Sequence, residues 1–189
     1  HQPDHFPLAE SIIGYRDEIG KRPPIASMEL IWTAHQGSHL MVNGFFHPPT
    51  EFNSWKALEI IGETNLITIK GLEGSTDLPI SRACITGHIE NKKFKRVILH
   101  PRDNDCFGKD VKWQNLDKWK YQVLEALENK GPLCQAVYWN AGFYLWISGI
   151  SKNLNEGINK AKSTLSSGLA KKRFEEIISW RSTINSLTI

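Results

Sequence analysis

Acidic and small residues meet in one loop of the chain, GLEGSTDLP, at residues 71–79. Glu73 and Asp77 are its two acids, and carboxylate oxygens can bind Mg²⁺ or accept hydrogen bonds within a turn. In a turn built from small residues, an aspartate commonly caps the backbone with its own side chain. The residues alone therefore favour a turn cap for Asp77.

The densest basic cluster of the chain consists of Lys92, Lys93, Lys95 and Arg96, with Phe94 among them. These residues fall on a predicted hairpin, and cations interleaved with an aromatic ring can contact a phosphate backbone. A solvated face is the more common role of such a run. The cluster therefore leaves both interpretations open.

His35 and His39 have the spacing of two metal ligands on one face of a helix. Gln36 stands where a zinc hydrolase has a glutamate, and Gly37–Ser38 disfavours a helix, so a polar loop is expected here. The sequence has no G-x-S-x-G motif and no Cys/His pairing for covalent catalysis. It also has no GxGxxG or GxxxxGK[ST] loop to cradle phosphates.

The composition suits one globular domain with a real core, since 40% of the 189 residues are hydrophobic and 23% are charged. A net charge of +3 is too small to indicate nucleic-acid binding without clustering. Cys84, Cys106 and Cys134 lack paired or metal-like spacing, which favours reduced thiols in the cytoplasm. No membrane span or signal peptide is expected. The chain starts at His1 rather than methionine, so we expect a piece of a longer polypeptide or a removed segment.

Hydrophobic periodicity predicts an α/β or α+β chain, with a mixed sheet flanked by helices. An amphipathic helix is expected over 6–19, ending at Gly20, and a second over 51–61, capped by Thr50. The side chains expected on the buried side of that second helix are Phe52, Trp55, Leu58 and Ile61. Strands are expected at 40–46, 65–70, 82–90 and 94–99, and further helices at 116–129, 133–148, 154–166 and 169–186.

One polar residue interrupts the apolar run of the helix predicted over 133–148. This residue is Asn140, and a buried amide needs hydrogen-bond partners. We therefore expect Asn140 to tie two elements of the fold together. A turn at Gly149 and a glycine cap at Gly168 are predicted on either side of the following helix.

Four motifs then occur in a specific order along the chain. They are YRDEIGKRPP at 15–24, NGFFHPP at 43–49, IKGLEGSTD at 69–77 and WNAGFYLWISGISKNLNEGINKAKSTLSSG at 139–168. This succession resembles the C-terminal half of the anthranilate phosphoribosyltransferase family, and the GLEGSTDLP wording looks closest to a divergent branch. The resemblance implies a nucleoside phosphorylase/phosphoribosyltransferase-like α/β domain at 36–189. Residues 1–35 would be the end of a small helical domain and the hinge, and the N-terminal half of the family is absent from this chain.

The resemblance also implies an activity. Family members transfer the phosphoribosyl group of phosphoribosyl pyrophosphate to the amine of anthranilate, in tryptophan biosynthesis, with Mg²⁺ on the pyrophosphate. Arg16 matches the arginine that faces the aromatic acid, and a guanidinium fork suits a carboxylate. Asp77 fills the first place of the family's Asp-Glu metal motif. The second place is taken by Leu78, which cannot bind a metal, and Glu73 is a weaker substitute for the missing acid. No catalytic residue is assigned, and a cytoplasmic homodimer is expected for the full protein.

Two alternatives remain open beside this activity. One carboxylate where the family has two argues for weakened or lost catalysis, which favours a non-catalytic nucleic-acid-binding paralogue that uses the basic cluster. The other alternative is a nucleoside phosphorylase-like enzyme. By resemblance the phosphate loop would lie upstream of His1, so this chain alone is expected to be inactive.

Overall fold

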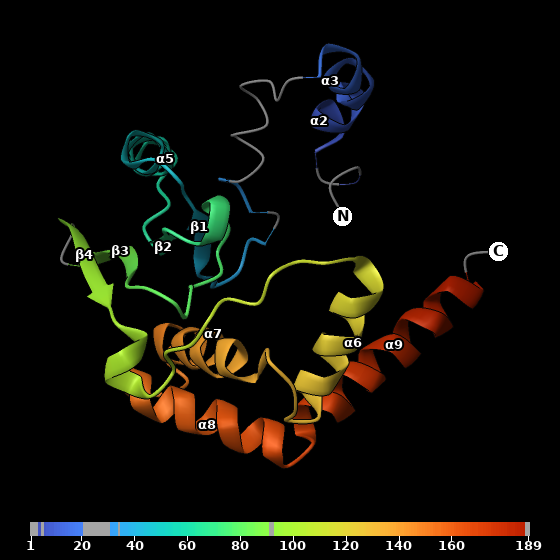
Figure 1. Ribbon diagram of the computed structural model, residues 1–189. Coiled ribbons are helices and arrows are strands. Elements are labelled where there is room, and N and C mark those ends of the chain that lie inside the picture. Colours follow the sequence, from blue (N-terminus) through green and yellow to red (C-terminus); the bar gives the residue numbers. More distant parts are fainter. Residues whose placement is uncertain (1–3, 5, 21–30, 34, 91–92, 188–189) are drawn as a thin grey trace. The chain divides into compact units, whose positions relative to one another are not determined.

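The computed structural model describes residues 4, 6–20, 31–33, 35–90 and 93–187 (Figure 1). The chain forms two compact units. The first consists of His1–Thr76 and Ile85–Val97, and the second of Asp77–Cys84 and Ile98–Ile189. The domain boundary predicted near residue 35 stays a prediction, because the neighbouring residues 21–30 lie outside the described part of the chain.

Two short helices, α2 (Pro7–Ser11) and α3 (Ile13–Ile19), occupy the region where one helix was predicted over 6–19. The single helix is wrong because the helical pattern breaks at Ile12, whose N–H donates to the Glu10 carbonyl. In an unbroken helix that N–H would donate to the Leu8 carbonyl, four residues back. The predicted end at Gly20 is confirmed: its φ is +63°, and its N–H donates to the Arg16 carbonyl.

A mixed four-stranded sheet forms the centre of the first unit, as the sequence predicted. Its strands are β1 (Met41–Gly44), β2 (Leu66–Ile69), β3 (Cys84–Glu90) and β4 (Lys93–Leu99), in the order β1-β2-β3-β4. β1 pairs parallel with β2, with Met41 opposite Leu66. β2 pairs antiparallel with β3, with Ile67 opposite His88. The predicted turn of the hairpin, residues 91–92, lies outside the described residues.

Helix α5 (Pro48–Ile60) connects β1 to β2 and begins earlier than predicted. Thr50 is not its cap: the helix has Pro48 in its first turn and His47 as its N-cap, without a side-chain capping bond. Proline suits this position because its ring presets the helical φ and its missing N–H would have had no partner there. Pro48 and Pro49 therefore form the start of the helix.

The buried face of α5 also differs from the prediction. Phe52 and Ile61 are exposed, at 58% and 66%, whereas Glu51 is 1% exposed. Leu58 is fully buried and packs with Met41 and Leu66 in the core of the first unit. The charged Glu51 thus lies on the buried face of α5, where the apolar pattern had predicted its neighbour Phe52.

Helices dominate the second unit, at the positions that the sequence predicted. They are α6 (Leu116–Leu127), α7 (Cys134–Ile147), α8 (Leu154–Ser166) and α9 (Leu169–Leu187), preceded by the 3₁₀ helix η2 (Pro101–Asn104). The Asn153 side chain caps α8 by accepting from the Glu156 N–H at 2.9 Å. Gly149 and Gly168 have positive φ at the ends of α7 and α8, as expected.

α7 and α8 pack side by side at unusually close range (Figure 1). Gly142 and Gly157 make this approach possible, since a Cβ atom on Gly157 would overlap the carbonyl oxygen of Gly142. Trp139, Phe143 and Ile158 are buried around this contact. No helix in the described part of the chain is long and apolar enough to cross a membrane. The three cysteines carry free thiols, in agreement with the prediction.

Candidate functional site

A buried segment without regular secondary structure, Leu78–Ile80, directly follows Asp77, the second acid of the loop at 71–79. Asn140, on α7, binds its first residue twice. The Leu78 N–H donates to Asn140 Oδ1 at 2.8 Å, and Asn140 Nδ2 donates to the Leu78 carbonyl at 3.0 Å. The second hydrogen of Nδ2 goes to the Ala136 carbonyl, one turn back on α7, at 3.0 Å. The prediction that Asn140 ties two elements together is confirmed.

The remaining backbone groups of this segment are also satisfied within the second unit. The Ile80 N–H donates to Asp110 Oδ1 at 3.1 Å, and the Ile80 carbonyl accepts from the Gly108 N–H at 3.1 Å. The Pro79 carbonyl accepts from the Cys84 thiol at 3.1 Å. Burial raises the pKa of that thiol to about 11, so Cys84 stays a neutral donor and is no nucleophile at neutral pH. Because unpaired buried polar groups are costly, this complete pairing holds the segment in place.

Asp77 is the exposed residue at which this buried segment emerges. Leu78 is 1% exposed, so the backbone changes from solvated to buried within one peptide unit. In the described residues no group of three or more His, Cys, Asp and Glu side chains gathers into a metal cage. Mg²⁺ at phosphate substrates needs only one or two carboxylates, because waters and phosphate oxygens complete its octahedron. Metal binding by Asp77 stays a prediction.

Glu73 lies in the first unit, in the 3₁₀ turn η1 (Leu72–Gly74), and its side chain is exposed. Its φ of +51° is uncommon for a residue other than glycine. The turn sits close to the end of β1, where a Cβ atom on Gly44 would overlap the carbonyl oxygen of Gly74. The glycine in NGFFHPP thus lets the acidic loop approach the strand. Metal binding by Glu73 stays a prediction.

Arg16 lies on α3 and is half-buried. It belongs to the first compact unit and Asp77 to the second, so their common role at one substrate stays a prediction. The helix ends at Gly20, one turn after Arg16. A guanidinium near a helix end can reach beyond the helix with its long side chain, as the recognition of a carboxylate requires.

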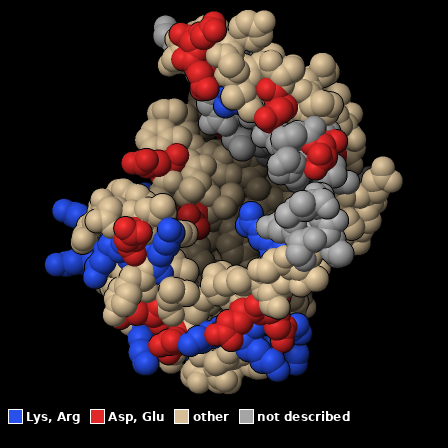
Figure 2. Space-filling view, turned by 90° about the vertical axis from the view of Figure 1, so that its right-hand side faces the viewer, with Lys and Arg blue, Asp and Glu red and all other residues tan. Residues whose placement is uncertain are grey.

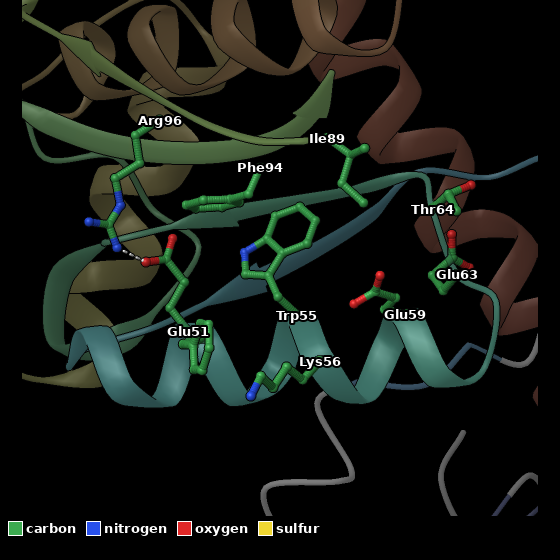
Figure 3. Close-up of a pocket in the computed structure, with 10 residues that line it drawn as sticks. Glu51, Trp55, Lys56, Glu59, Glu63, Thr64, Ile89, Phe94 and Arg96 are labelled. Atoms are coloured by element: carbon green, nitrogen blue, oxygen red, sulfur yellow. Dashed lines mark hydrogen bonds and ion pairs between the residues drawn. The ribbon is translucent and has the colours of Figure 1, made fainter. Parts of the chain in front are cut away.

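The basic cluster of the hairpin is less uniform than its sequence suggests. Arg96 forms an ion pair with the buried carboxylate of Glu51 (Figure 3). Glu51 also accepts from the Thr68 hydroxyl at 2.7 Å. Arg96 therefore neutralises an internal charge. Lys93 and Lys95 are exposed on β4, and Lys92 lies outside the described residues. On the face seen in Figure 2, acidic and basic side chains lie beside one another. Nucleic-acid binding by this cluster stays a prediction.

A cavity of about 590 Å³ lies between α5 and the β3–β4 strands of the first unit (Figure 3). Trp55 and Phe94 meet edge to face inside it, with ring centroids 4.8 Å apart. The Glu51–Arg96 pair closes one end, and Glu59 and Glu63 also line the cavity. Phe94, the aromatic residue of the basic cluster, thus packs against Trp55 of α5, and it is 45% exposed.

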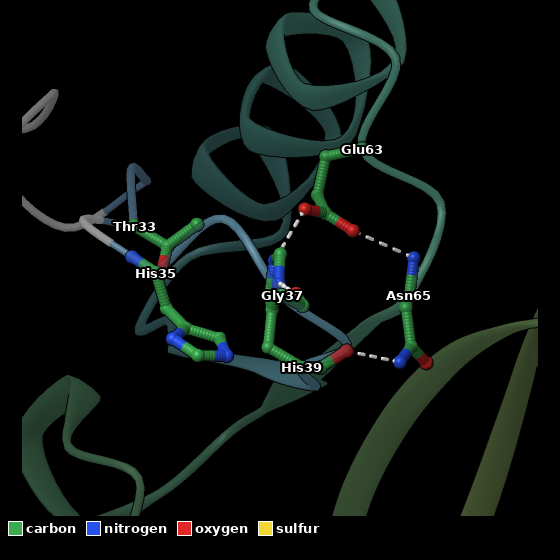
Figure 4. A network of polar contacts seen from close by, with 6 residues as sticks. All are labelled: Thr33, His35, Gly37, His39, Glu63 and Asn65. Carbon is green, nitrogen blue, oxygen red and sulfur yellow. Dashed lines mark hydrogen bonds and ion pairs between the residues drawn. The ribbon is translucent and has the colours of Figure 1, made fainter.

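His39 is held in a polar network at the start of β1 (Figure 4). Its Nδ1 lies 2.8 Å from the Gly37 carbonyl oxygen, and its Nε2 lies 2.8 Å from Glu63 Oε2. Asn65 closes the network by donating its N–H to Glu63 Oε1 and its side-chain amide to the His39 carbonyl. Two acceptors facing one imidazole favour the doubly protonated ring. His39 lies in a loop, as the sequence predicted.

The pKa values of this pair move apart. The hydrogen bond to the Gly37 carbonyl, and then that to Glu63, raise the pKa of His39. Burial opposes ionisation of Glu63, but the hydrogen bonds from the Asn65 N–H and from His39 outweigh it and lower the pKa of this carboxyl. No motif in the sequence singles out Glu63, and its place in the polar turn GETN after α5 is the only signal.

Known proteins with related sequences were compared with this chain, and no family model matches it. It is 25% identical over 186 residues to the anthranilate phosphoribosyltransferase of Polaromonas sp., which covers 96% of this chain and 53% of that protein. The protein of the same name from Polynucleobacter necessarius is 24% identical over 180 residues, covering 93% and 52%. The chain thus spans about half the length of the curated relatives it matches.

Solved structures of similar fold carry the same name. An anthranilate phosphoribosyltransferase from Saccharomyces cerevisiae in complex with 4-fluoroanthranilate has a TM-score of 0.71 at 17% identity, covering 91% of this chain and 51% of that one. A variant of the yeast protein with Mg bound reaches 0.75 at 17% identity, over the same shares of the two chains. The protein from Thermus thermophilus has a TM-score of 0.68 at 23% identity, covering 92% and 52%.

These likenesses agree with the order of elements and with the resemblance of the four motifs. The mixed sheet flanked by helices is the phosphoribosyltransferase/nucleoside phosphorylase-like fold. In sequence and in fold, this chain is similar to about half of an anthranilate phosphoribosyltransferase, as a divergent relative.

Proposed function

We propose that the full protein transfers phosphoribose from phosphoribosyl pyrophosphate to an aromatic amine that carries a carboxylate, such as anthranilate. The observation that supports this most is the similarity to anthranilate phosphoribosyltransferases over 96% of the chain. The complex of the yeast relative with 4-fluoroanthranilate supports an acceptor of this kind. Such a reaction would serve tryptophan biosynthesis.

The reaction is a displacement at the anomeric carbon of the ribose. The amine nitrogen forms a bond to this carbon, and the bond from the carbon to the pyrophosphate oxygen breaks with its electron pair on the oxygen. The nitrogen then loses a proton to solvent. Holding both substrates in line lowers the barrier by removing their freedom to misalign, and this positioning needs no nucleophile from the protein.

Arg16 and Asp77 would divide the binding of the two substrates. The guanidinium of Arg16 would take the acceptor's carboxylate through two parallel hydrogen bonds, which fixes the ring and therefore the amine. Asp77 would hold a divalent cation by one carboxylate oxygen, directly or through water. When bound, Mg²⁺ would neutralise charge on the departing pyrophosphate. Leu78 stands where the family motif has its second acid and cannot bind a metal, and the exposed Glu73 is only a weaker substitute. Phosphate oxygens and waters must therefore complete the coordination of the cation.

The pyrophosphate also needs a cradle of backbone N–H groups, which the described residues do not supply as a glycine-rich phosphate loop. By resemblance that cradle lies in the part of the relatives that this chain does not span. We therefore assign the activity to the full protein, as a homodimer in the cytoplasm. Sedimentation of the full protein would test the homodimer.

The assay that tests this function is the initial rate of pyrophosphate release by the full protein. We expect release only when phosphoribosyl pyrophosphate, anthranilate and Mg²⁺ are all present. The proposal would be overturned if no pyrophosphate is released with anthranilate or with other aromatic amines that carry a carboxylate. Salt-sensitive binding of single-stranded DNA, lost when Lys93 and Lys95 are changed to alanine, would instead favour the nucleic-acid-binding alternative.

Arg16 can be tested in the same assay. We expect Arg16→Gln to raise the KM for anthranilate about 10- to 100-fold, since a charged bidentate pair contributes roughly 1.5–3 kcal/mol. The KM for phosphoribosyl pyrophosphate should stay unchanged. Arg181→Gln, on the exposed face of α9, is the matched control and should leave both constants unchanged. Equal changes in both constants would contradict the assignment.

A further inference from the structure

Asn140 is an unusual residue in its setting, because its amide makes three hydrogen bonds to backbone groups. Both hydrogens of Nδ2 and one lone pair of Oδ1 are taken, at 2.8–3.0 Å. The orientation of the amide is unambiguous, since the Leu78 N–H requires an acceptor and the Leu78 carbonyl requires a donor. The bond to the Ala136 carbonyl fixes the side chain on its own helix. Asn140 thus joins α7 rigidly to one residue of a distant loop.

The residue that it holds is the neighbour of Asp77. Consecutive Cα atoms lie about 3.8 Å apart, so a fixed Leu78 strongly restricts where the Asp77 carboxylate can go. Asp77 itself is exposed. The Asp110 carboxylate and the Cys84 thiol hold the next two residues of the segment. Of these contacts, the one made by Asn140 is closest in sequence to Asp77.

We propose that Asn140 is a positioning residue, which fixes the Asp77 carboxylate for a divalent cation by clamping the Leu78 backbone to α7. This inference rests on the proposed function in one respect, the role of Asp77 as a cation ligand. A carboxylate on a mobile loop must be ordered when the cation binds, and that ordering weakens the affinity. The clamp completes this ordering before the cation arrives.

A double-mutant cycle between Asn140 and Asp77 tests this role directly. The variants are Asn140→Asp, Asp77→Ala and both together, in the full protein. Aspartate keeps the size of the side chain and an acceptor for the Leu78 N–H, but it cannot donate to the two carbonyls. The measured quantity is the Kd of Mn²⁺, the probe, in the presence of inorganic pyrophosphate. Asn104→Asp is the control, since Asn104 likewise donates to a backbone carbonyl, that of His100 at 3.2 Å, but at an exposed site.

We expect Asn140→Asp to raise the Kd about tenfold when Asp77 is present and to change it little in the Asp77→Ala background. The control should have no effect, and exchange of the Leu78 amide hydrogen should accelerate only in the Asn140 variant. An equal rise of the Kd in both backgrounds, or no rise in either, would overturn the proposal. If Asn140→Asp does not fold, Asn140→Ser enters the same cycle with the same expectation.

The outcomes also separate this inference from the proposed function. Mn²⁺ binding that depends on Asp77 and Asn140, without any phosphoribosyl transfer, would overturn the function and support the positioning role. An unchanged Kd in the Asp77→Ala variant would show that Asp77 is no ligand, and the positioning role would fail with it. Transfer activity in that case would still support the proposed function through other ligands.

Discussion

Glu51 shows how a single charge can be placed inside this fold. Its carboxylate is almost completely buried on α5, where it accepts from Thr68 on β2 and pairs with Arg96 on β4. Removing one partner of such a pair leaves the other charge without compensation. Arg96 is 46% exposed, so water screens part of that loss.

We therefore expect Glu51→Gln to lower the free energy of unfolding by about 1–3 kcal/mol in urea titrations. Glu59→Gln on the same helix is the control, because Glu59 is exposed; its effect should stay within about 0.5 kcal/mol. Equal effects of the two substitutions would contradict the buried pair.

The His39–Glu63 pair predicts a particular dependence of stability on pH. The folded His39 has a pKa above its ordinary 6.5, so its stabilisation is complete below that value and is lost as the pH rises through the raised pKa. The folded Glu63 has a pKa below its ordinary 4.5, so its stabilisation is complete above that value and is lost as the pH falls through the lowered pKa. The contribution of the pair is therefore greatest between these ordinary values.

The measurement is the difference in Tm between the unmodified protein and His39→Gln as a function of pH. We expect it to be largest near pH 5.5, between the two ordinary pKa values, and to shrink on either side. His100→Gln, at an exposed histidine, should show no such maximum. A difference that grows steadily as the pH rises above neutrality would contradict the network.

At the scale of elements, the packing of α7 on α8 depends on two missing side chains. A Cβ on Gly157 would meet the backbone of α7, which cannot rotate away as a flexible side chain can. We expect Gly157→Ala to lower the free energy of unfolding by about 1–3 kcal/mol, since the helices must separate. Gly14→Ala in α3 is the matched control: it has open space at its Cβ and should be neutral or slightly stabilising. Calorimetric Tm values of both variants check this, and equal destabilisation would refute the close contact.

The same elements show what the sequence could and could not predict. α6 and α8 show clear helical periodicity of their apolar residues, and Gly149 and Gly168 follow the ends of α7 and α8, so these positions were predictable from local pattern. Asn140 could be identified because one polar residue in an apolar helix demands partners. Glu51 could not, since its partner Arg96 lies 45 residues away and a charge in the first turn of a helix ordinarily faces solvent. The break between α2 and α3 lies at Ile12, and the apolar periodicity of residues 6–19 does not reveal it.

At the scale of the whole molecule, Arg16 belongs to the first compact unit and Asp77 to the second. In the second unit, Asn140 holds Leu78, the residue after Asp77, by accepting a hydrogen bond from its N–H. In the first unit, Arg16 lies on α3 near the end of the helix. Similarity to anthranilate phosphoribosyltransferases extends across both units, because it covers 96% of the chain.

The most direct measurement is a crystal structure of the full protein with phosphoribosyl pyrophosphate, Mg²⁺ and anthranilate. We predict that the Arg16 guanidinium lies about 2.7–2.9 Å from the carboxylate of anthranilate. The Asp77 carboxylate should lie about 2.0–2.1 Å from Mg²⁺, or one water away from it. A complex in which both side chains point away from the bound substrates would contradict the account.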